Sequence, residues 1–267
     1  MKVVTEVLGM QDLYKKHPYV SAAYASLVYL FFTGMCVWSI CVFVVLICGS
    51  MPAPYNTLHS LGYTTVAVLW FTAFIRANIT PAYAPETGDY AALAPSPSPT
   101  CPKCSRIRRP RTHHCGVCGE CVALMDHHCP WIVYGCVGHA NYKFFVLVCL
   151  YGFLGVVYMV SVTYAYGWYD WVSPLRHWTE DEEVVAIGSA AAIPIGAYFL
   201  SLLVIHGKHM AVGETHFEAL ARTFGWSTAV PEHTYDKGSA WANFRLRLGP
   251  TPWKWCLPLA DPHPHHH

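Results

Sequence analysis

Residues 24–48 read YASLVYLFFTGMCVWSICVFVVLIC and contain no Asp, Glu, Lys or Arg. A helix needs about 20 apolar residues to cross the hydrocarbon core of a bilayer, so this stretch is long enough to span a membrane. It belongs to a longer uncharged run, residues 17–75, which glycine and proline interrupt at residues 49–54. We therefore predict two membrane helices here, over residues 24–48 and 58–79.

Two later stretches repeat the pattern, and the composition of the whole chain agrees with it. Residues 144–168 and 184–206 also lack charged side chains. Of the 267 residues, 54% are hydrophobic and 12% are charged, whereas about a quarter of the residues of a soluble domain are charged. We predict a mainly α-helical, polytopic membrane protein with four transmembrane helices. We expect Pro194 to kink the fourth helix or to loosen its backbone hydrogen bonding.

The distribution of positive charge predicts the orientation of these helices. With four spans, both termini and the loop between the second and third helices share one side, which carries sixteen of the seventeen Lys and Arg residues. Only Arg176 lies opposite, in the loop over residues 169–183. By the positive-inside tendency the basic side is cytosolic and the loop at 169–183 is lumenal. Lys15 and Lys16 precede a first helix of full span length, so we expect that helix to stay attached rather than to be cleaved as a signal sequence.

The helices divide the chain into five predicted parts. Because the formal net charge is only +1, we expect no nucleic-acid partner for any of them. The five parts are the cytosolic N-terminus (1–23), helices 1 and 2 (24–79), a cytosolic cysteine-rich module (80–143), helices 3 and 4 with their lumenal loop (144–206), and a cytosolic C-terminal tail (207–267).

The cysteine-rich module is also rich in histidine. Residues 80–143 hold seven of the twelve cysteines and five histidines. A reducing cytosol disfavours disulfides, so the CxxC spacings indicate zinc ligands, which stabilise loops that have few apolar residues to bury. Two closed sites of three cysteines and one histidine would leave one cysteine over, whereas seven cysteines with one histidine would leave none. The count alone leaves both arrangements open.

The run Asp126-His127-His128-Cys129 favours the arrangement with a free cysteine. A thiol with the ordinary pKa of about 8.5 is mostly protonated at neutral pH. An imidazole that accepts the proton, and is itself oriented by a carboxylate, makes the thiol a better nucleophile. Binding of His128 to zinc would fix the backbone between that base and the thiol. The four residues therefore indicate a nucleophilic site beside a metal site.

These residues resemble the motif of the DHHC protein S-acyltransferases, the zinc-dependent palmitoyltransferases of eukaryotic membranes. The four-helix layout is similar as well. Thr215-His-Phe-Glu218 is similar to the family's Thr-Thr-x-Glu element, and Tyr235-Asp-Lys-Gly238 with Asn243 is similar to its C-terminal motif. Within the module the resemblance covers Cys101-Pro-Lys-Cys104, Arg109-Pro-Arg111, His114-Cys115, Cys118, Cys121, Asp126-His-His-Cys-Pro-Trp131, Cys136-Val-Gly138, and Asn141 with Phe144-Phe145.

The resemblance implies a two-step acyl transfer. Cys129 attacks a long-chain acyl-CoA such as palmitoyl-CoA, holds the acyl group as a thioester and passes it to a cysteine of a target protein. His127 is the implied general base, positioned by Asp126. Two structural zinc ions are implied, one bound by Cys101, Cys104, His114 and Cys121, and the other by Cys115, Cys118, His128 and Cys136.

Other positions take their predicted roles from the same motifs. Arg109 and Arg111 belong to a basic cluster suited to the phosphates of coenzyme A, with a solvated or headgroup-facing patch as an equal alternative. Trp131 is predicted to contact acyl-CoA. The predicted structural residues are Thr215, Glu218 and Asn243.

The resemblance also leads to expectations for the site of the acyl tail, the partners and the location of the protein. Burial of each methylene contributes ~0.8 kcal/mol, so we expect the acyl tail to lie among the membrane helices, where Gly152 and Gly155 leave room between the first and third spans. The expected partners are the lipid bilayer and membrane-associated proteins that carry a reactive cysteine. The expected location is the Golgi, the endoplasmic reticulum or the plasma membrane.

The sequence departs from the family's pattern in three places. Residues 132–135 put one residue more than usual before Cys136 and lack the usual asparagine, a change that bears on coordination by Cys136. His216 stands where the family has a second threonine, so the hydrogen bond of that hydroxyl must be replaced or lost. Ile79-Thr-Pro81 stands where the family has aspartate-proline-glycine.

Two other functions use the same residues. One is a zinc-stabilised scaffold without catalysis, and the other is an acyl-thioester hydrolase in which water is the acceptor. A transporter is disfavoured because the spans hold no charged residue except Arg76, near the end of the second span. His206 and His209, spaced i, i+3, are predicted to mark an interfacial helix end, and an amphipathic helix is predicted around residues 241–248.

Overall fold

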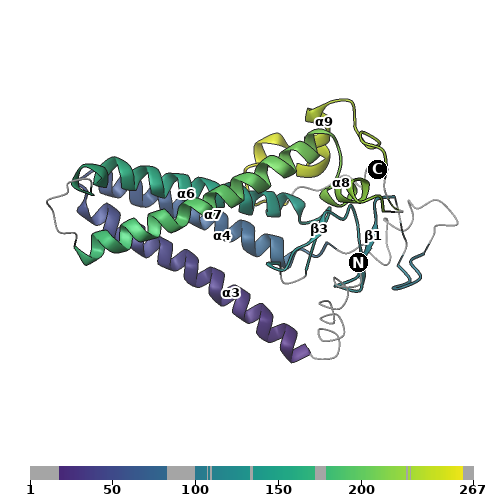
Figure 1. The fold of residues 1–267 in the computed structure, drawn as a ribbon, viewed down its shortest axis with the longest axis horizontal. Helices are drawn as coiled ribbons and strands as arrows, with labels where there is room; N and C mark the ends of the chain where they lie inside the picture. The colour runs from purple at the N-terminus through teal and green to yellow at the C-terminus, as the bar shows by residue number, and fades with distance from the viewer. Residues whose placement is uncertain are drawn as a thin grey trace. The chain divides into compact units, whose positions relative to one another are not determined.

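Four long helices dominate the structure, a computed structural model that describes residues 18–82, 100–106, 108, 110–132, 135–171, 179–226, 228 and 230–260. Each helix is long and apolar enough to cross a membrane, and large apolar side chains such as Leu30 and Ile187 are about 70% exposed. This exposure is expected where lipid rather than water is the solvent. The four-helix prediction is confirmed, and the chain is an integral membrane protein. The helices are α3 (Pro18–Cys41), α4 (Tyr55–Ile79), α6 (Tyr142–Trp171) and α7 (Glu180–Ala211) (Figure 1).

The helix ends differ from those predicted for local reasons. Helix α3 gives way to a π-helical segment, η1 (Val42–Ile47), and a 3-10 turn, η2 (Cys48–Ser50). Helix α7 begins at Glu180, earlier than predicted, because four acidic residues occupy its first turn, where negative charge is favourable. A rule that counts only uncharged residues misses that turn. The helix continues unbroken through Pro194 and ends at Ala211.

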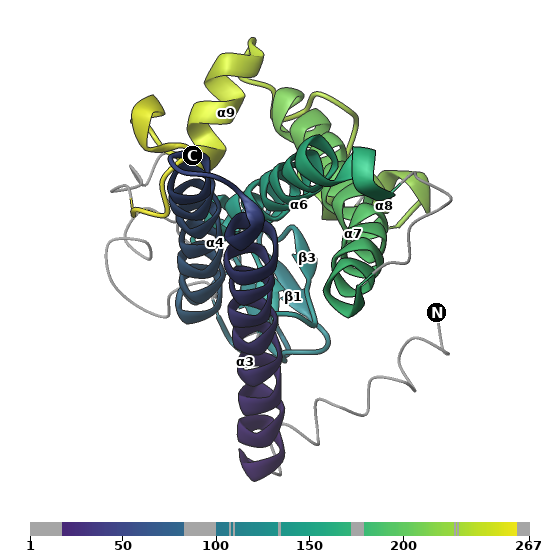
Figure 2. The same cartoon turned by 90° about the vertical axis from the view of Figure 1, so that its left-hand side faces the viewer.

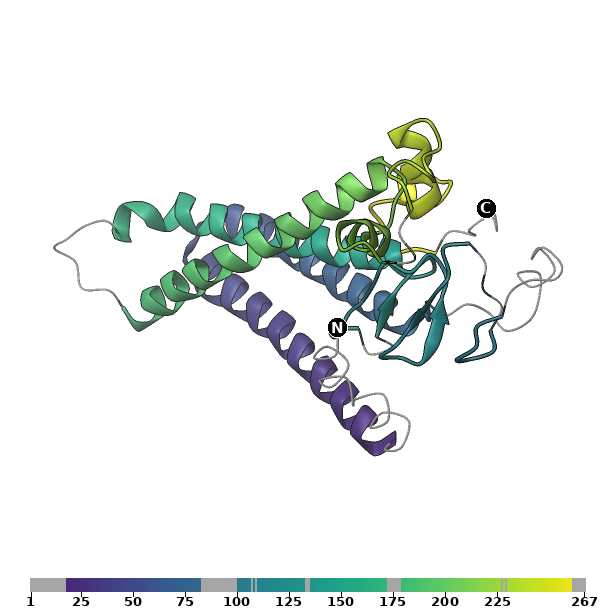
Figure 3. The ribbon, with the colours of Figure 1, turned by 45° about the vertical axis from the view of Figure 1, so that its right-hand side comes forward.

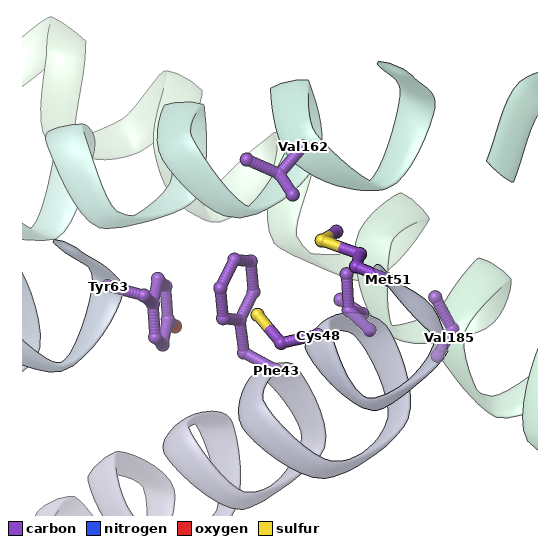
Figure 4. Packing of buried hydrophobic residues seen from close by; sticks show 7 residues of the cluster. Phe43, Cys48, Met51, Tyr63, Val162 and Val185 are labelled. Carbon is purple, nitrogen blue, oxygen red and sulfur yellow. The ribbon is translucent and has the colours of Figure 1, made fainter. Parts of the chain in front are cut away.

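One compact unit consists of residues 31–74 and 146–205, which include the second half of α3, the segments η1 and η2, and most of α4, α6 and α7. Its core includes Phe43 and Tyr63, whose rings stack with centroids 4.2 Å apart. These apolar contacts hold η1 against α4, and side chains of α6 and α7 complete the cluster. The buried residues of this core are Phe43, Ile47, Cys48, Met51, Tyr63, Val162 and Val185 (Figure 4).

The same unit contains an open apolar cavity of about 480 Å³. Gly152 and Gly155, the two glycines singled out in the sequence, both line it. A side chain at Gly152 would collide with the ring of Phe199, at 2.6 Å from the added carbon, whereas one at Gly155 would meet only Val66, at 3.7 Å. The room at Gly152 is therefore already used by a neighbouring ring, and Gly155 is the more open position.

The other compact unit contains residues 75–145 and 206–267 together with the start of the chain up to Leu30. Two small antiparallel hairpins form its cysteine-rich part: β1 (His113–Cys115) pairs with β2 (Glu120–Val122), and β3 (His127–His128) pairs with β4 (Cys136–Val137). This is the module predicted between the second and third helices (Figure 3). Helices α8 (His216–Thr223) and α9 (Ala240–Leu248) and the 3-10 turn η3 (Pro252–Lys254) belong to the same unit (Figure 2).

Candidate metal centres and active site

The first metal centre is built around the β1–β2 hairpin. The hairpin register pairs His114 with Cys121 across the two strands, which brings two donors that are seven residues apart into contact. Cys101 Sγ lies 3.6 Å from His114 Nδ1, and Cys104 Sγ lies 3.5 Å from Cys121 Sγ. The ligand atoms of these four residues all lie within 4.8 Å of one another.

The second metal centre is built in the same way on the β3–β4 hairpin. The register pairs His128 with Cys136. Cys118 Sγ lies 3.3 Å from Cys136 Sγ and 3.5 Å from His128 Nδ1, and Cys115 Sγ lies 3.7 Å from the same nitrogen. Cys136 therefore belongs to this cluster despite the additional residue that precedes it.

The donor sets fit zinc. Two thiolates bound to one tetrahedral zinc at about 2.3 Å each are separated by roughly 3.8 Å, close to the separations of 3.3 and 3.5 Å found here. A disulfide would need a separation of about 2.05 Å, and none of the cysteines that the structure describes forms one. Two Cys/His clusters in this chain can therefore hold metal ions.

The loop before Cys136 is shaped by Gly135, at the end of the unusually long segment. Its φ of +81° is left-handed, a conformation that favours glycine. An added Cβ would lie 2.6 Å from Cys118 Sγ and 2.8 Å from His128 Cε1, so a side chain here would displace two donors of the second cluster. Glycine thus allows the longer loop to return Cys136 to the cluster.

Asp126, His127 and Cys129 form the candidate catalytic group beside the second cluster. Asp126 is completely buried, and its Oδ2 lies 2.9 Å from His127 Nδ1. The thiol of Cys129 lies close enough to the His127 imidazole to raise its pKa. Cys129 is the one cysteine of the module that joins neither metal cluster in the described part of the chain. A buried carboxylate, an imidazole and a thiol outside the metal centres are thus adjacent.

The charges of this group are strongly coupled. Burial alone would raise the pKa of Asp126, but the hydrogen bond to His127 and the nearby charge of Arg247 hold it well below its usual value. Burial alone would lower the pKa of His127, but the hydrogen bond with Asp126 and the nearby thiol of Cys129 raise it to about 9. An imidazole with that pKa retains at neutral pH a proton taken from the neighbouring thiol.

Three residues far along the chain position Asp126. Arg247 of α9 donates from Nη2 to Asp126 Oδ1 at 3.1 Å, and the backbone N–H of His216 donates to the same oxygen at 3.2 Å. His206 Nδ1 lies 3.5 Å from Oδ2. The backbone of His216 thus supplies a hydrogen bond to Asp126 where the family has a hydroxyl-bearing residue.

Sequence reasoning missed two of these contacts. Arg247 is 2% exposed and stacks over the ring of Tyr142 at 3.7 Å. Arg247 follows Asn243 by four residues, so the two side chains share one face of α9. This spacing was the feature of the sequence from which the burial of Arg247 could have been predicted. His206 and His209 are also buried, whereas the sequence suggested an interfacial helix end.

Thr215 and Glu218 begin α8 with a reciprocal capping box. Thr215 Oγ1 accepts from the N–H of Glu218, and Glu218 Oε2 accepts from the N–H of Thr215 at 2.8 Å. Arg111 donates to both carboxylate oxygens of Glu218 at 2.7 Å and to the carbonyl of Gly213 at 2.9 Å. These bonds favour a structural role for Arg111 over binding of a phosphate. Arg109 lies outside the described residues.

Asn243 and Trp131 contrast in their surroundings. Asn243 is fully buried and donates to the carbonyl of Ala211 and to Asp236, while its Oδ1 accepts from the N–H of Lys237. It therefore ties the end of α7 to the segment before α9. Trp131 is 52% exposed, next to Pro130, whose carbonyl accepts a hydrogen bond from Tyr24 Oη.

Known proteins share this module. Residues 95–223 match the family described as DHHC palmitoyltransferase. The chain is 33% identical over 151 residues to Palmitoyltransferase ZDHHC15 of Xenopus laevis, a match that covers 55% of this chain and 41% of that protein. It is 33% identical over 167 residues to Probable protein S-acyltransferase 12 of Arabidopsis thaliana, covering 60% of this chain and 53% of the relative. The matches span about half the length of these curated relatives or less.

The family match coincides with the geometry. It includes both Cys/His clusters, the Asp126–His127–Cys129 group and the capping box of α8. Residues 95–223 therefore resemble a DHHC palmitoyltransferase domain.

Proposed function

We propose that this protein is a protein S-acyltransferase that moves a long-chain acyl group, with palmitoyl as the type case, from acyl-CoA to cysteines of target proteins. The proposal rests on the position of the Cys129 side chain. This side chain is adjacent to His127 and lies outside both Cys/His clusters, so it is available as a nucleophile. The names of the relatives, palmitoyltransferase and protein S-acyltransferase, support the same reaction.

In the first step His127 takes the thiol proton of Cys129, and the thiolate attacks the carbonyl carbon of acyl-CoA. The carbonyl carbon–sulfur bond to coenzyme A breaks, and the departing thiolate takes up a proton from His127. Asp126 accepts from His127 Nδ1, which leaves Nε2 for the thiol and stabilises the imidazolium that forms.

In the second step a cysteine of the target protein replaces coenzyme A. His127 takes the proton of the target thiol, the resulting thiolate attacks the carbonyl carbon of the acyl-Cys129 thioester, the bond from that carbon to Cys129 breaks, and the released Cys129 thiolate takes the proton back from His127. Each step exchanges one thioester for another, so neither needs a large driving force. The protein's contribution is therefore to hold the thiol, the base and the acyl group together and to keep water away.

Two zinc ions would have a structural role. They would be held by the Cys101–Cys104–His114–Cys121 and Cys115–Cys118–His128–Cys136 clusters. Zinc in such closed sites supplies folding stability, on the order of 10 kcal/mol per site. Binding of His128 would fix the backbone on which both His127 and Cys129 lie.

The apolar cavity of the helical unit is the proposed site for the acyl tail. Its volume of about 480 Å³ is in the range of typical ligand pockets. Its walls include Trp70, Tyr151 and Phe199, and burial of methylenes there contributes ~0.8 kcal/mol each. Chain-length preference would then depend on the depth of this cavity.

The proposed orientation places both termini and the metal-binding module in the cytosol, following the distribution of Lys and Arg. Acyl-CoA and membrane-associated target proteins are the proposed substrates. Trp131, half exposed and two residues after Cys129, is the proposed contact for acyl-CoA at the site. Golgi, endoplasmic reticulum and plasma membrane are the proposed locations.

An acyl-transfer assay on the purified full chain tests this function. The chain is incubated with labelled palmitoyl-CoA and a membrane-anchored acceptor that carries a cysteine. We expect a hydroxylamine-sensitive label first on the chain and then on the acceptor, with little release of free fatty acid. Absence of label on a chain that retains two zinc ions would favour a scaffold, and rapid release of fatty acid without acceptor label would favour a hydrolase.

A further inference from the structure

Four histidines gather around Asp126, more than an acid–base pair requires. His127, His206, His209 and His216 have neighbouring ring centroids between 5.4 and 6.4 Å apart. They come from three separate segments of one compact unit. Neither Cys/His cluster includes any of them.

Three of the side chains in this group converge on one point. Asp126 Oδ2 lies 2.9 Å from His127 Nδ1 and 3.5 Å from His206 Nδ1. Two nitrogen or oxygen ligands bound to a tetrahedral zinc at about 2.0 Å each are separated by roughly 3.3 Å. The observed separations bracket that value, and the three ligand atoms all lie within 4.8 Å of one another.

The remaining polar groups define which atoms are available to an ion. Arg247 and the N–H of His216 both use Asp126 Oδ1, which leaves Oδ2 to face the two imidazoles. His209 Nδ1 pairs with Glu214 at 2.8 Å, and His209 Nε2 lies 3.3 Å from His216 Nδ1. These two histidines are engaged with each other, so the site has three protein ligands.

We propose that Asp126, His127 and His206 bind a third divalent metal ion of the zinc type, and that this ion inhibits the enzyme. The ligands are two imidazoles and one carboxylate, and a fourth position remains for water, the arrangement of sites that bind zinc reversibly or catalytically rather than as closed structural centres. The guanidinium of Arg247 near Asp126 weakens cation binding, so the site fills only when free zinc rises.

Inhibition follows from the nitrogen that the ion occupies. With the ion on His127 Nδ1, the ring proton moves to Nε2, and the imidazole can no longer accept the thiol proton of Cys129. His206 Nδ1 is the second nitrogen ligand of the proposed ion. The hydroxyl of Tyr142 lies 3.3 Å from this nitrogen and must turn away before the ion can bind there. This consequence rests on the function proposed above, whereas binding of the third ion does not.

The test counts zinc ions on the full chain. Because His263, His265, His266 and His267 can bind zinc themselves, all four are replaced by alanine, and Cys129→Ser removes the free thiol. We expect the number of bound zinc ions to rise from two to three as free zinc is increased. His206→Leu should return the number to two, and His233→Ala, which changes an exposed histidine, should leave it at three. The two remaining ions in the His206 variant also report that the module is folded.

Two further readouts separate the possible results. Cobalt(II) added as the third ion should give no additional thiolate-to-metal absorption, and in the chain with Cys129 restored, zinc should lower self-acylation by about 100-fold, reversibly on chelation. A count that stays at two, a third ion retained in His206→Leu, or new thiolate-to-cobalt absorption would overturn the site. Absence of self-acylation before zinc is added would instead count against the proposed function and leave the zinc count interpretable.

Discussion

His127→Ala is expected to lower self-acylation at neutral pH by about 100-fold or more, the usual contribution of a general base. His127 is the imidazole in contact with Cys129, and without it the thiol keeps its proton at pH 7. The loss should shrink at alkaline pH, where hydroxide can replace the imidazole as the base. Rates of acyl-enzyme formation measured between pH 6 and about 9.5 check this.

Asp126→Ala is the matched comparison. It removes the group that orients the imidazole and leaves the imidazole itself, so we expect weak activity to remain. Zinc content of both variants should stay at two ions per chain, which separates a catalytic loss from unfolding of the module. A wild-type rate in His127→Ala at neutral pH would remove the general-base assignment.

Cys136→Ser is expected to remove one of two zinc ions and with it the order of the hairpin that carries Cys129. Cys136 Sγ lies 3.3 Å from Cys118 Sγ and pairs with His128 across β3 and β4. A structural zinc contributes on the order of 10 kcal/mol to folding, a large amount for a short loop. We expect zinc content to fall from two to one and self-acylation to be lost.

Cys256→Ser is the control for that substitution, because Cys256 is an exposed cysteine outside both clusters. It should retain two zinc ions and normal acylation. If Cys136→Ser also retained two ions, Cys136 would not be a ligand, and the longer loop before it would have changed the coordination of the second site.

The four helices could be predicted from the sequence because an uncharged stretch of about 20 residues is a local feature, and in a membrane protein it indicates a helix that spans the bilayer. Sequence reasoning missed the first turn of α7, where acidic residues are stabilised by the helix N-terminus. It also indicated zinc ligands in the cysteine-rich module, because CxxC spacings are local, but the division of those ligands into two sets of four came from the family resemblance. The pairing of His114 with Cys121 and of His128 with Cys136 needed the hairpin registers, which spacing does not specify.

The residues of other segments that contact Asp126 could not be predicted from the sequence, because they lie far from it along the chain. Arg247 lies 121 residues away along the chain, and its position depends on how the C-terminal segment packs on the module. Arg111 illustrates the same limit, since its motif position suggested a phosphate ligand but its guanidinium binds Glu218, 107 residues away. The five-part division of the chain and the roles of the site residues remain predictions.

Cys129 is central to the account, and native mass spectrometry of the full chain after exposure to palmitoyl-CoA tests its role most directly. The wild-type chain should carry two zinc ions and one acyl group, removable by hydroxylamine and located on Cys129 by fragmentation. The Cys129→Ser chain should carry two zinc ions and no acyl group. Loss of a zinc ion in Cys129→Ser, or an acyl group at another residue of the wild-type chain, would show that Cys129 is a metal ligand or a bystander and would contradict the account.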